Sequence, residues 1–329
     1  MSIHDKAIVL VTGASGFLGH HVVRSLEEYR NSASGARRGI KILTPNSSEL
    51  DLLNSNATRL YLLRHKPEIV IHLAAQCGGI GINREKPGEF LYNNLMMTTN
   101  LIECCRELSK EKEAGIDLRK FVGIGTVCSY PKHTPVPFKE ENLYDGYPEE
   151  TNAPYGIAKR IQLEMLKAYR TQYGFNGIFL IPVNMAGEWD NFSDDSSHVI
   201  PAMLKKFHRA KNEEAPHVTL WGDGSASREF LYAGDCAEAI LRATLLYNNP
   251  EPVNIGTGSE ITIRELAEKI QKVVGYDGEI VWDTTKPNGQ PRRCLDTSRA
   301  QAGFNFTAQT SLDEMLHRSY KWAQENNVL

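Results

Sequence analysis

The chain has 329 residues, with 37 Lys and Arg against 40 Asp and Glu and a formal net charge of −3. Hydrophobic residues make up 41% and charged residues 23%, ordinary values for a globular protein in water. This near balance of charge argues against a protein that binds nucleic acid or an acidic membrane surface, and no run of eighteen uncharged apolar residues is present to span a bilayer.

Cysteine usage indicates a reducing compartment. Six cysteines are spread along the chain, at Cys77, Cys104, Cys105, Cys128, Cys236 and Cys294. They form no CxxC pair and no metal-ligand spacing with histidine, which is typical of reduced thiols in a chain of this size. The N-terminus lacks the residue order of a signal peptide. We therefore expect a cytoplasmic protein without disulfides or a bound metal ion.

Strand-like and helix-like segments alternate through the first half of the sequence. Short apolar runs rich in β-branched residues predict buried strands, and apolar residues recurring every three or four positions predict helices. In chain order, we expect strands at 7–12, 41–44, 68–73 and 121–125, with helices at 19–29 and 93–108. Such alternation builds a parallel sheet through right-handed crossovers. The predicted fold class is therefore α/β, with a Rossmann-type doubly wound parallel sheet.

In the second half of the sequence, strands and helices alternate only at the beginning. A helix at 155–173 and a strand at 177–181 continue the sheet, and loops, short strands and amphipathic helices follow, at 199–211, 233–247 and 263–274. We expect a Rossmann domain at 1–183 with return segments near 230–258, and a smaller C-terminal α/β substrate domain at 184–329. Ligands of such folds bind at the carboxyl ends of the parallel strands, here in the cleft between the two domains.

The loop after the first strand is typical of dinucleotide-binding proteins. Its three glycines, between a strand and a helix, allow a tight turn, close approach of a pyrophosphate and tight packing of helix on strand. The helix N-terminus behind the loop supplies free N–H groups and the positive end of a dipole. We expect the cofactor to contact Gly13, Ser15, Gly16, Phe17, Leu18 and Gly19.

The end of the second strand bears on which dinucleotide binds. An acidic residue there would bind the ribose diol of NAD, whereas this chain reads Leu43-Thr44-Pro45-Asn46-Ser47-Ser48. Hydroxyl and amide groups at this place allow a 2′-phosphate without charge repulsion. NADP(H) is therefore favoured, with Ser47 at the phosphate, and NAD(H) is left open.

Tyr155 and Lys159 place a phenol and an ammonium four residues apart, on one face of the predicted helix at 155–173. A free tyrosine has a pKa of about 10. A lysine charge beside it favours the phenolate, so the phenol would exchange a proton with a sugar hydroxyl or ketone near neutral pH. The spacing also occurs by chance, but here it follows a strand that ends at a hydroxyl, Thr126. We interpret the pair as catalytic.

Together these motifs resemble the extended short-chain dehydrogenase/reductases, and among them the GDP-L-fucose synthase family. Members of that family are 3,5-epimerase/4-reductases of GDP-4-keto-6-deoxy-D-mannose. Besides the glycine loop and the Tyr/Lys pair, the segments that carry the resemblance are 72–80, 127–131, 190–192, 197–202, 221–224, 228–230, 254–258 and 283–287. They run from the first strand nearly to the C-terminus, so the resemblance covers almost the whole chain.

The resemblance implies roles for the residues around the Tyr/Lys pair. Cys128 is implied as the base and His198 as the acid that epimerise the carbons beside the C4 ketone. Thiols and imidazoles both exchange protons near neutral pH. Tyr155 would protonate the C4 oxygen during reduction, assisted by Lys159 and Thr126. The cofactor contacts that the resemblance adds are Ala74, Ala75, Lys159 and His198.

A GDP-sugar is the partner that the resemblance implies. Arg228 and Lys206 are cations that would neutralise its diphosphate, the arginine through a bidentate fork. Trp221 offers an aromatic face for the base. Lys286 matches a family lysine near the nucleotide sugar, and Asn184 would bind a phosphate or sugar edge. The family also implies a homodimer through the helices at 93–108 and 155–173.

Two departures from the family keep alternatives open. Thr126 stands where the family has serine, and Ala186-Gly187-Glu188-Trp189 replaces a Tyr-Gly-Pro loop. A reductase or epimerase of a related GDP-4-keto sugar, such as a heptose, is one alternative, and an NAD-retaining NDP-sugar 4-epimerase is another. A 4,6-dehydratase is disfavoured because no carboxylate follows Thr126. A non-enzymatic NADP sensor is disfavoured because the Tyr/Lys pair is retained.

Overall fold

The computed structural model describes residues 6–32, 39–78, 80–110, 115–194, 196–286, 288 and 290–329. Its central sheet has the strand order β2-β1-β3-β4-β5-β9, and every neighbouring pair is parallel. The strands are β1 (Ile8–Thr12), β2 (Lys41–Leu43), β3 (Ile69–His72), β4 (Lys120–Ile124), β5 (Gly177–Pro182) and β9 (Val253–Ile255). The predicted Rossmann-type sheet is confirmed, and its order reverses between β1 and β3, the place where such sheets bind ligands.

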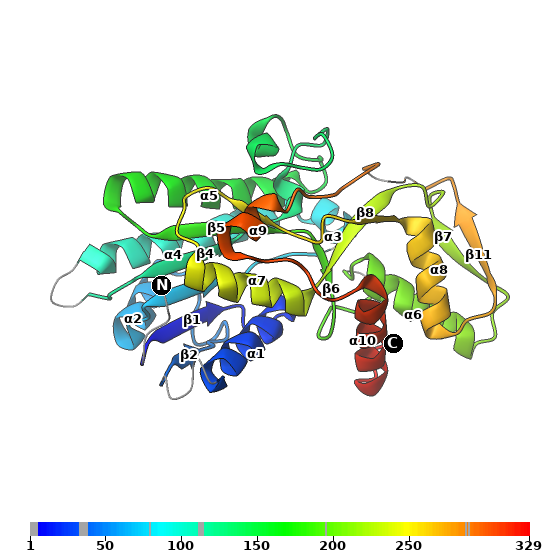
Figure 1. Ribbon diagram of the computed structural model, residues 1–329, viewed down its shortest axis with the longest axis horizontal. Helices are drawn as coiled ribbons and strands as arrows, with labels where there is room; N and C mark the ends of the chain where they lie inside the picture. Colours follow the sequence, from blue (N-terminus) through cyan, green and yellow to red (C-terminus); the bar gives the residue numbers. More distant parts are fainter. Residues whose placement is uncertain are drawn as a thin grey trace.

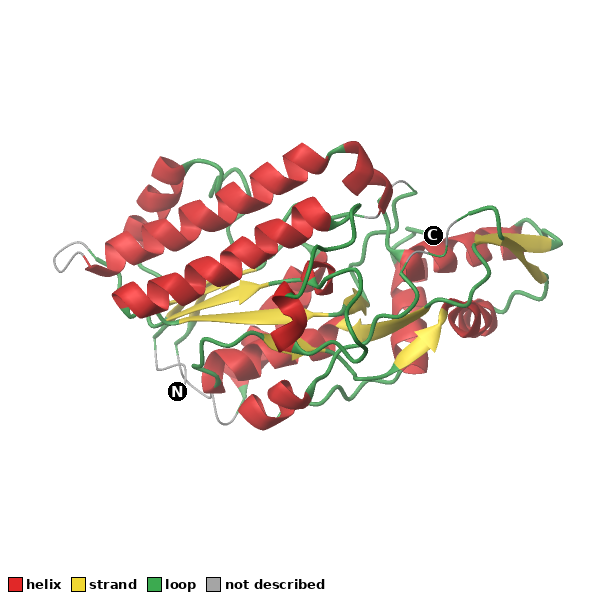
Figure 2. Ribbon diagram, turned by 90° about the horizontal axis from the view of Figure 1, so that it is seen from above, coloured by secondary structure: helices red, strands yellow, loops and turns green. Residues whose placement is uncertain are grey.

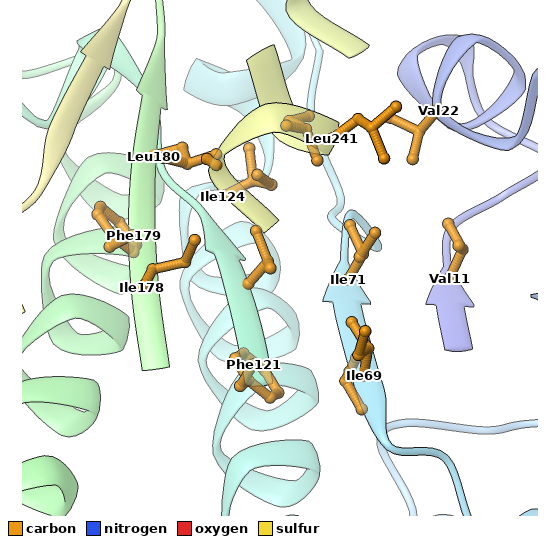
Figure 3. Packing of buried hydrophobic residues seen from close by; sticks show 14 of the residues in the cluster. Val11, Val22, Ile69, Ile71, Phe121, Ile124, Ile178, Phe179, Leu180 and Leu241 are labelled. Atoms are coloured by element: carbon orange, nitrogen blue, oxygen red, sulfur yellow. The ribbon is translucent and has the colours of Figure 1, made fainter. Parts of the chain in front are cut away.

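Helices cover both faces of this sheet (Figures 1 and 2). On one face α4 (Pro87–Lys110) and α5 (Ala153–Tyr173) lie side by side, with α2 (Ser55–His65) next to α4. On the other face α1 (Phe17–Asn31) packs along α7 (Ala233–Leu246). Figure 3 shows Val22 of α1 and Leu241 of α7 above the sheet residues Ile71 and Ile124. Burial on both faces explains why these strands read as continuous apolar runs.

The five strands predicted for the sheet agree with the structure to within one residue at each end. The helix predicted at 93–108 begins earlier, at Pro87, because proline is favoured in the first turn, where its missing N–H has no partner to lose. Two sheet-side elements were not predicted, α2 and the sixth strand β9. The apolar residues of α2 do not gather on one face, and β9 has only three residues.

The rest of the chain builds a smaller part, on the right in Figure 1. One sheet has the order β10-β8-β6, and another pairs β11 with β7. The strands are β6 (Asn184–Ala186), β7 (His217–Trp221), β8 (Ser227–Tyr232), β10 (Glu260–Thr262) and β11 (Glu279–Asp283). The helices are α6 (Val199–Asn212), α8 (Ile263–Val274) and α10 (Leu312–Glu325). The short elements belong instead with the six-stranded sheet and its helices: α3 (Ile80–Glu85), α9 (Ser298–Phe304) and the 3-10 turns η1 (Val127–Ser129) and η2 (Glu140–Tyr144).

Buried hydrophobic side chains gather in two clusters. One lies around the six-stranded sheet and includes residues of α7, β9 and α9, which return to it from the second half of the chain. The other lies among α6, α8, α10 and the small sheets. Within the described residues, no helix is long and apolar enough to cross a membrane.

Glu229 of β8 joins the two parts. Its side chain is fully buried and accepts the backbone N–H groups of Thr257 and Gly258 through Oε1 and that of Leu295 through Oε2, at 2.7 Å. Burial raises the pKa of this carboxyl, while the backbone donors act in the opposite direction. A buried acceptor with this many donors orders the segments that follow β9 and precede α9.

Replacing Glu229 with glutamine tests this joint. The side-chain amide of glutamine has one oxygen and one NH₂ group, and the NH₂ group cannot accept a hydrogen bond. At least one of the backbone N–H groups that Glu229 now accepts would therefore lose its acceptor. We expect Glu229→Gln to lower the free energy of unfolding by about 1–3 kcal/mol, measured by urea denaturation. Glu268→Gln, the same change at an exposed position of α8, should leave it unchanged. Equal effects of the two changes would contradict the role given to Glu229.

Candidate active site

The glycine loop forms a close-fitting turn at the carboxyl end of β1. Gly13 has φ of +71°, and a Cβ built on it would lie 2.7 Å from the backbone nitrogen of Ala74. A Cβ on Gly19 would lie 2.2 Å from the carbonyl oxygen of Gly13. Gly16 is the N-cap of α1 and has no side chain to cap it. The first turn of α1, Phe17 and Leu18, thus stands at the loop with backbone N–H groups suited to a phosphate.

Buried polar side chains connect this loop to the segment after β3. Thr12 Oγ1 is hydrogen-bonded to His72 Nδ1 at 2.8 Å and accepts the N–H of Ala74 at 3.3 Å. His72 Nε2 is bonded to Thr98 Oγ1 of α4 at 3.1 Å. Burial, and secondly the charge of Lys159, lowers the pKa of His72 to about 3, so this ring is neutral. The segment holding Ala74 and Ala75, partly exposed beside the loop, is thereby fixed.

Tyr155 and Lys159 lie on one face of α5, as predicted, with the lysine Nζ 5.9 Å from the centre of the phenol ring. The expectation that the lysine lowers the pKa of Tyr155 is wrong for this structure. Burial raises that pKa well above its usual range, helped by the neighbouring sulfurs of Cys77 and Cys128. Burial also lowers the pKa of Lys159 to about 8. Tyr155 is therefore a neutral phenol at physiological pH, suited to donate a proton.

Cys128 is held against α5 by the backbone. It lies in η1, directly after β4, and its N–H donates to Thr126 Oγ1 at 3.2 Å. Ser129 Oγ donates to the carbonyl of Gly156 at 3.0 Å. A Cβ on Gly156 would come within 2.5 Å of the Cys128 carbonyl oxygen, so only glycine allows η1 to approach the helix this closely. The sulfur of Cys128 is near enough to Tyr155 to act on the pKa of its phenol.

Two arginines bring positive charge to the same place. Arg293, which sequence reasoning missed, donates from Nη1 to Cys128 Sγ at 3.6 Å. It is also bonded to Gln290, whose amide donates to the carbonyl of Lys132. Burial, then Arg293, lowers the pKa of Arg228 to about 10, while the sulfur of Cys128 acts in the other direction. Arg293 has no local sequence signal, because it reaches the site only when the chain returns from β11.

His198 lies at the N-cap of α6, with its side chain 48% exposed. Its Nδ1 is 3.7 Å from Oδ1 of the buried Asp190. The nearby carboxylate of Asp190 raises the pKa of His198 above its ordinary value, although burial opposes this. Asp190 in turn raises the pKa of the Cys77 thiol, behind the larger effect of burial. Because Cys77 also acts on the pKa of Tyr155, Asp190 and Tyr155 share this neighbour.

The other expected substrate residues lie farther along the small part. Trp221, 68% exposed, stands at the end of β7 with the Lys286 ammonium 5.8 Å from its ring. Lys206 of α6 donates to the carbonyl of Thr219, also on β7, at 2.9 Å. Asn184 of β6 donates to the Glu229 carbonyl at 3.2 Å. Within the described residues, no hydrogen bond or ion pair joins these four side chains to Cys128. Lys286 lies beside Trp221, and Arg293, later in the same segment of the chain, contacts Cys128.

Two loops bear on the expected specificity. Ser47 is exposed beyond β2, next to Asn46, whose Oδ1 accepts N–H groups of Ser48 and Glu49 and so orders the turn. In the loop that departs from the family, Trp189 has φ of +64° and stacks on His20 of α1 with ring centres 5.2 Å apart. Within the described parts of the chain, no three His, Cys, Asp or Glu gather into a metal site.

The parallel sheet, the glycine loop at its carboxyl edge and the Tyr155–Lys159 pair define an enzyme of the extended short-chain dehydrogenase/reductase type. Residues 9–256 match the NAD dependent epimerase/dehydratase family, and the chain belongs to that family.

Known proteins resemble the chain over its whole length. It is 36% identical over 320 residues to the probable GDP-L-fucose synthase 1 of Oryza sativa subsp. japonica, which covers 97% of this chain and 93% of that one. It is 36% identical over 331 residues to the GDP-L-fucose synthase of Escherichia coli (strain K12), covering 98% of each. A solved structure of the GDP-mannoheptose C4 reductase from Campylobacter jejuni with NADP bound has a TM-score of 0.84 at 27% identity, covering 98% of this chain and 99% of that one.

The fit of the glycine loop is testable by adding one methyl group. Gly19→Ala places its Cβ on the Gly13 carbonyl, so the loop must shift away from its phosphate-binding shape. We expect NADPH affinity, measured by fluorescence titration, to fall by at least about tenfold, since each 1.4 kcal/mol of lost contact is tenfold. Gly88→Ala, in the first turn of α4 with nothing within 4 Å, is the matched control and should bind normally. Normal binding by Gly19→Ala would refute this role of the loop.

Proposed function

We propose that this protein converts GDP-4-keto-6-deoxy-D-mannose into GDP-L-fucose, by epimerisation at C3 and C5 and NADPH-dependent reduction at C4. The observation that carries the proposal is the position of Cys128, whose sulfur acts on the pKa of Tyr155 and of Arg228 and accepts a hydrogen bond from Arg293. A reductase alone needs a phenol and a lysine. A second proton-transfer group beside the phenol is what an additional carbon-acid step requires.

NADP(H) is the cofactor we propose. The close-packed glycines and the N-terminus of α1 fit a pyrophosphate, and Ser47, exposed beyond β2, presents a hydroxyl without an acidic charge. The heptose reductase with NADP bound supports the same choice. When bound, the cofactor supplies the hydride for reduction at C4. Ala74, Ala75, Lys159 and His198 complete its proposed contacts.

Three residues would serve the reduction. Tyr155, kept as a neutral phenol by burial, donates its proton to the C4 oxygen as negative charge develops there. The ammonium of Lys159 stabilises the phenolate that remains. Thr126 Oγ1, at the end of β4, offers a hydroxyl to the same oxygen.

Cys128 and His198 would serve the epimerisations. The C4 ketone acidifies the C–H bonds at C3 and C5, and a thiolate at Cys128 removes the proton from one face. The guanidinium of Arg293 donates to that sulfur from 3.6 Å. His198, whose pKa is raised, returns a proton on the opposite face.

The cations suggest how the GDP-sugar lies. We propose that the base stacks near Trp221 and Lys286, that Lys206, Arg228 and Arg293 neutralise the diphosphate, and that the sugar points to Cys128. Contacts made by the stretch after β11 support this direction. Lys286 lies over Trp221, Asn288 accepts the N–H of Asp223, and Arg293 donates to Cys128. Asn184, at the joint beside Glu229, would bind a phosphate or sugar edge.

A related GDP-4-keto sugar is the second candidate. The similarity to the heptose reductase favours it, and so does the loop Ala186–Trp189, which departs from the GDP-L-fucose synthases and packs on α1. NADPH oxidation by purified protein should be followed at 340 nm with GDP-4-keto-6-deoxy-D-mannose and, in parallel, a GDP-4-keto-heptose. Faster turnover of the first supports the proposed function, and turnover of the heptose alone overturns it. Bound NAD with no consumption of NADPH would indicate a 4-epimerase.

We also propose a cytoplasmic homodimer with the two-domain division at residue 183. The exposed side chains of Tyr92 on α4 and Ile161 on α5, helices that lie side by side, support the dimer. The two clusters of buried side chains support the division, and α7 and β9 fall within the return segments near 230–258.

The substitution Cys128→Ser separates the epimerisations at C3 and C5 from the reduction at C4. Because a serine hydroxyl is far less acidic than a thiol, we expect the overall reaction to fall at least about 100-fold, the scale of a lost general base. Reduction of a substrate already epimerised at C3 and C5 should persist. Cys77→Ser replaces the other thiol that acts on Tyr155 and should retain the overall reaction. Loss in Cys77→Ser with retention in Cys128→Ser would reverse the assignment.

The pH profile of the reduction step tests Lys159. Its ammonium is present below a pKa of about 8 and is lost as pH rises through that value. With the substrate already epimerised, we expect the rate to decline above about pH 8. Lys159→Arg keeps its charge, so its rate should be lower but flat over the same range. A decline in both proteins at the same pH would assign the titration to another group.

A further inference from the structure

Asp190 is a buried carboxylate that accepts fewer hydrogen bonds than its two oxygens allow. It lies in the connection between β6 and α6, and its side chain is 2% exposed. Oδ1 accepts the backbone N–H of Asn191 at 2.7 Å. Oδ2 is fully enclosed and has no hydrogen-bond partner among the described residues. A buried carboxylate with so few donors is costly unless a positive charge faces it.

Aromatic side chains on both sides fix the backbone at Asp190. Trp189 stacks on His20 and meets His21 edge-on, with ring centres 4.9 Å apart, so the connection is held on α1. Phe192 is buried and packs against Trp322 of α10, with ring centres 6.2 Å apart. These contacts hold the carboxylate between α1 and α10 and aim it at the N-terminus of α6.

His198 is the cation that this carboxylate meets. The separation of 3.7 Å between Nδ1 and Oδ1 is just longer than a hydrogen bond, so a small rotation of the exposed ring closes it. With Nδ1 turned to Asp190, the free ring nitrogen is Nε2. Among the described residues, Asp190 is the charged group that acts on His198, and Cys77 is a further titratable group facing Asp190.

We propose that Asp190 is a positioning residue, which holds the His198 ring by Nδ1 and keeps it protonated for delivery of a proton from Nε2 to the sugar. The proposal rests on the proposed function, because the acid role of His198 belongs to it. Asp190 itself touches neither sugar nor cofactor in this account.

The proton balance of one epimerisation shows what Asp190 contributes. The Cys128 thiolate takes the C–H proton as the enolate forms, and the imidazolium gives its Nε2 proton to the opposite face of the same carbon. Cys128 ends as a thiol, and His198 ends neutral with its remaining proton on Nδ1 toward Asp190. That tautomer leaves Nε2 free to regain a proton from water, which the exposed edge of the ring admits. Cys128 releases its proton to water, and both groups return to their starting states.

The substitution Asp190→Asn tests the proposal, because it removes the carboxylate charge and keeps the shape of the side chain. In Asp190→Asn, full-length protein without substrate, the NMR titration of the His198 ring should move to lower pH, because the carboxylate that favours the charged ring is gone. His198→Gln identifies the signal. Asp194→Asn is the matched control, because Asp194 lies in the same connection but is exposed and pairs with Lys205. This control should leave the His198 titration unchanged, and Asp190→Glu, which restores a carboxylate, should return it toward the wild-type value.

The second readout is epimerisation alone. Without NADPH, deuterium uptake from D₂O into GDP-4-keto-6-deoxy-D-mannose should be about tenfold slower in Asp190→Asn at pH 8, and this deficit should shrink as the pH falls and the ring gains its proton in both proteins. An unchanged His198 titration in a folded Asp190→Asn protein would overturn the proposal. So would equal shifts in Asp190→Asn and Asp194→Asn. The titration requires no turnover, so failure of the proposed function would show only as absence of uptake in the wild-type protein.

Discussion

The site depends on the close approach of η1 to α5 at Gly156. A side chain at this position would meet the backbone of Cys128, and its absence lets the turn after β4 lie on the helix that carries Tyr155 and Lys159. Ser129 Oγ bonds the Gly156 carbonyl, and Arg160 Nε bonds the Ser129 carbonyl at 2.7 Å. A thiol and a phenol from two elements are therefore fixed relative to each other by backbone geometry. This is the kind of rigid support that proton transfer needs.

Around that contact, the two parts of the molecule contribute different chemistry. The parallel sheet provides the glycine loop, the neutral His72 and the Tyr155–Lys159 pair. The smaller part brings Arg228, Arg293 and, through α6, His198. Buried carboxylates occur where the parts join: Glu229 accepts backbone N–H groups with both oxygens, whereas one oxygen of Asp190 has no donor among the described residues. The fully hydrogen-bonded Glu229 therefore has a structural environment. Asp190 has that of a carboxylate which a cation would stabilise.

The sequence was informative where a single segment carries the signal. The sheet strands could be placed because burial on both faces demands apolar runs, and the glycine loop and Tyr155/Lys159 because their spacing is local. Arg293 and Asp190 could not be found this way, since each acquires its meaning from a partner on another element. The state of Tyr155 was also mispredicted. Spacing shows that a lysine is near, but not that burial raises the pKa of the phenol. From the sequence, Trp189 indicated only that a loop departs from the family pattern. The structure shows that its side chain packs on α1.

The central claim is that one site performs both carbon-acid chemistry and ketone reduction. The most direct measurement is mass spectrometry and NMR of the product formed in D₂O from GDP-4-keto-6-deoxy-D-mannose and NADPH. The account predicts GDP-L-fucose with solvent deuterium at C3 and C5 and one NADPH consumed for each product. Consumption of NADPH that gives a product without deuterium at either carbon would show a plain C4 reductase, and would contradict the roles assigned to Cys128 and His198.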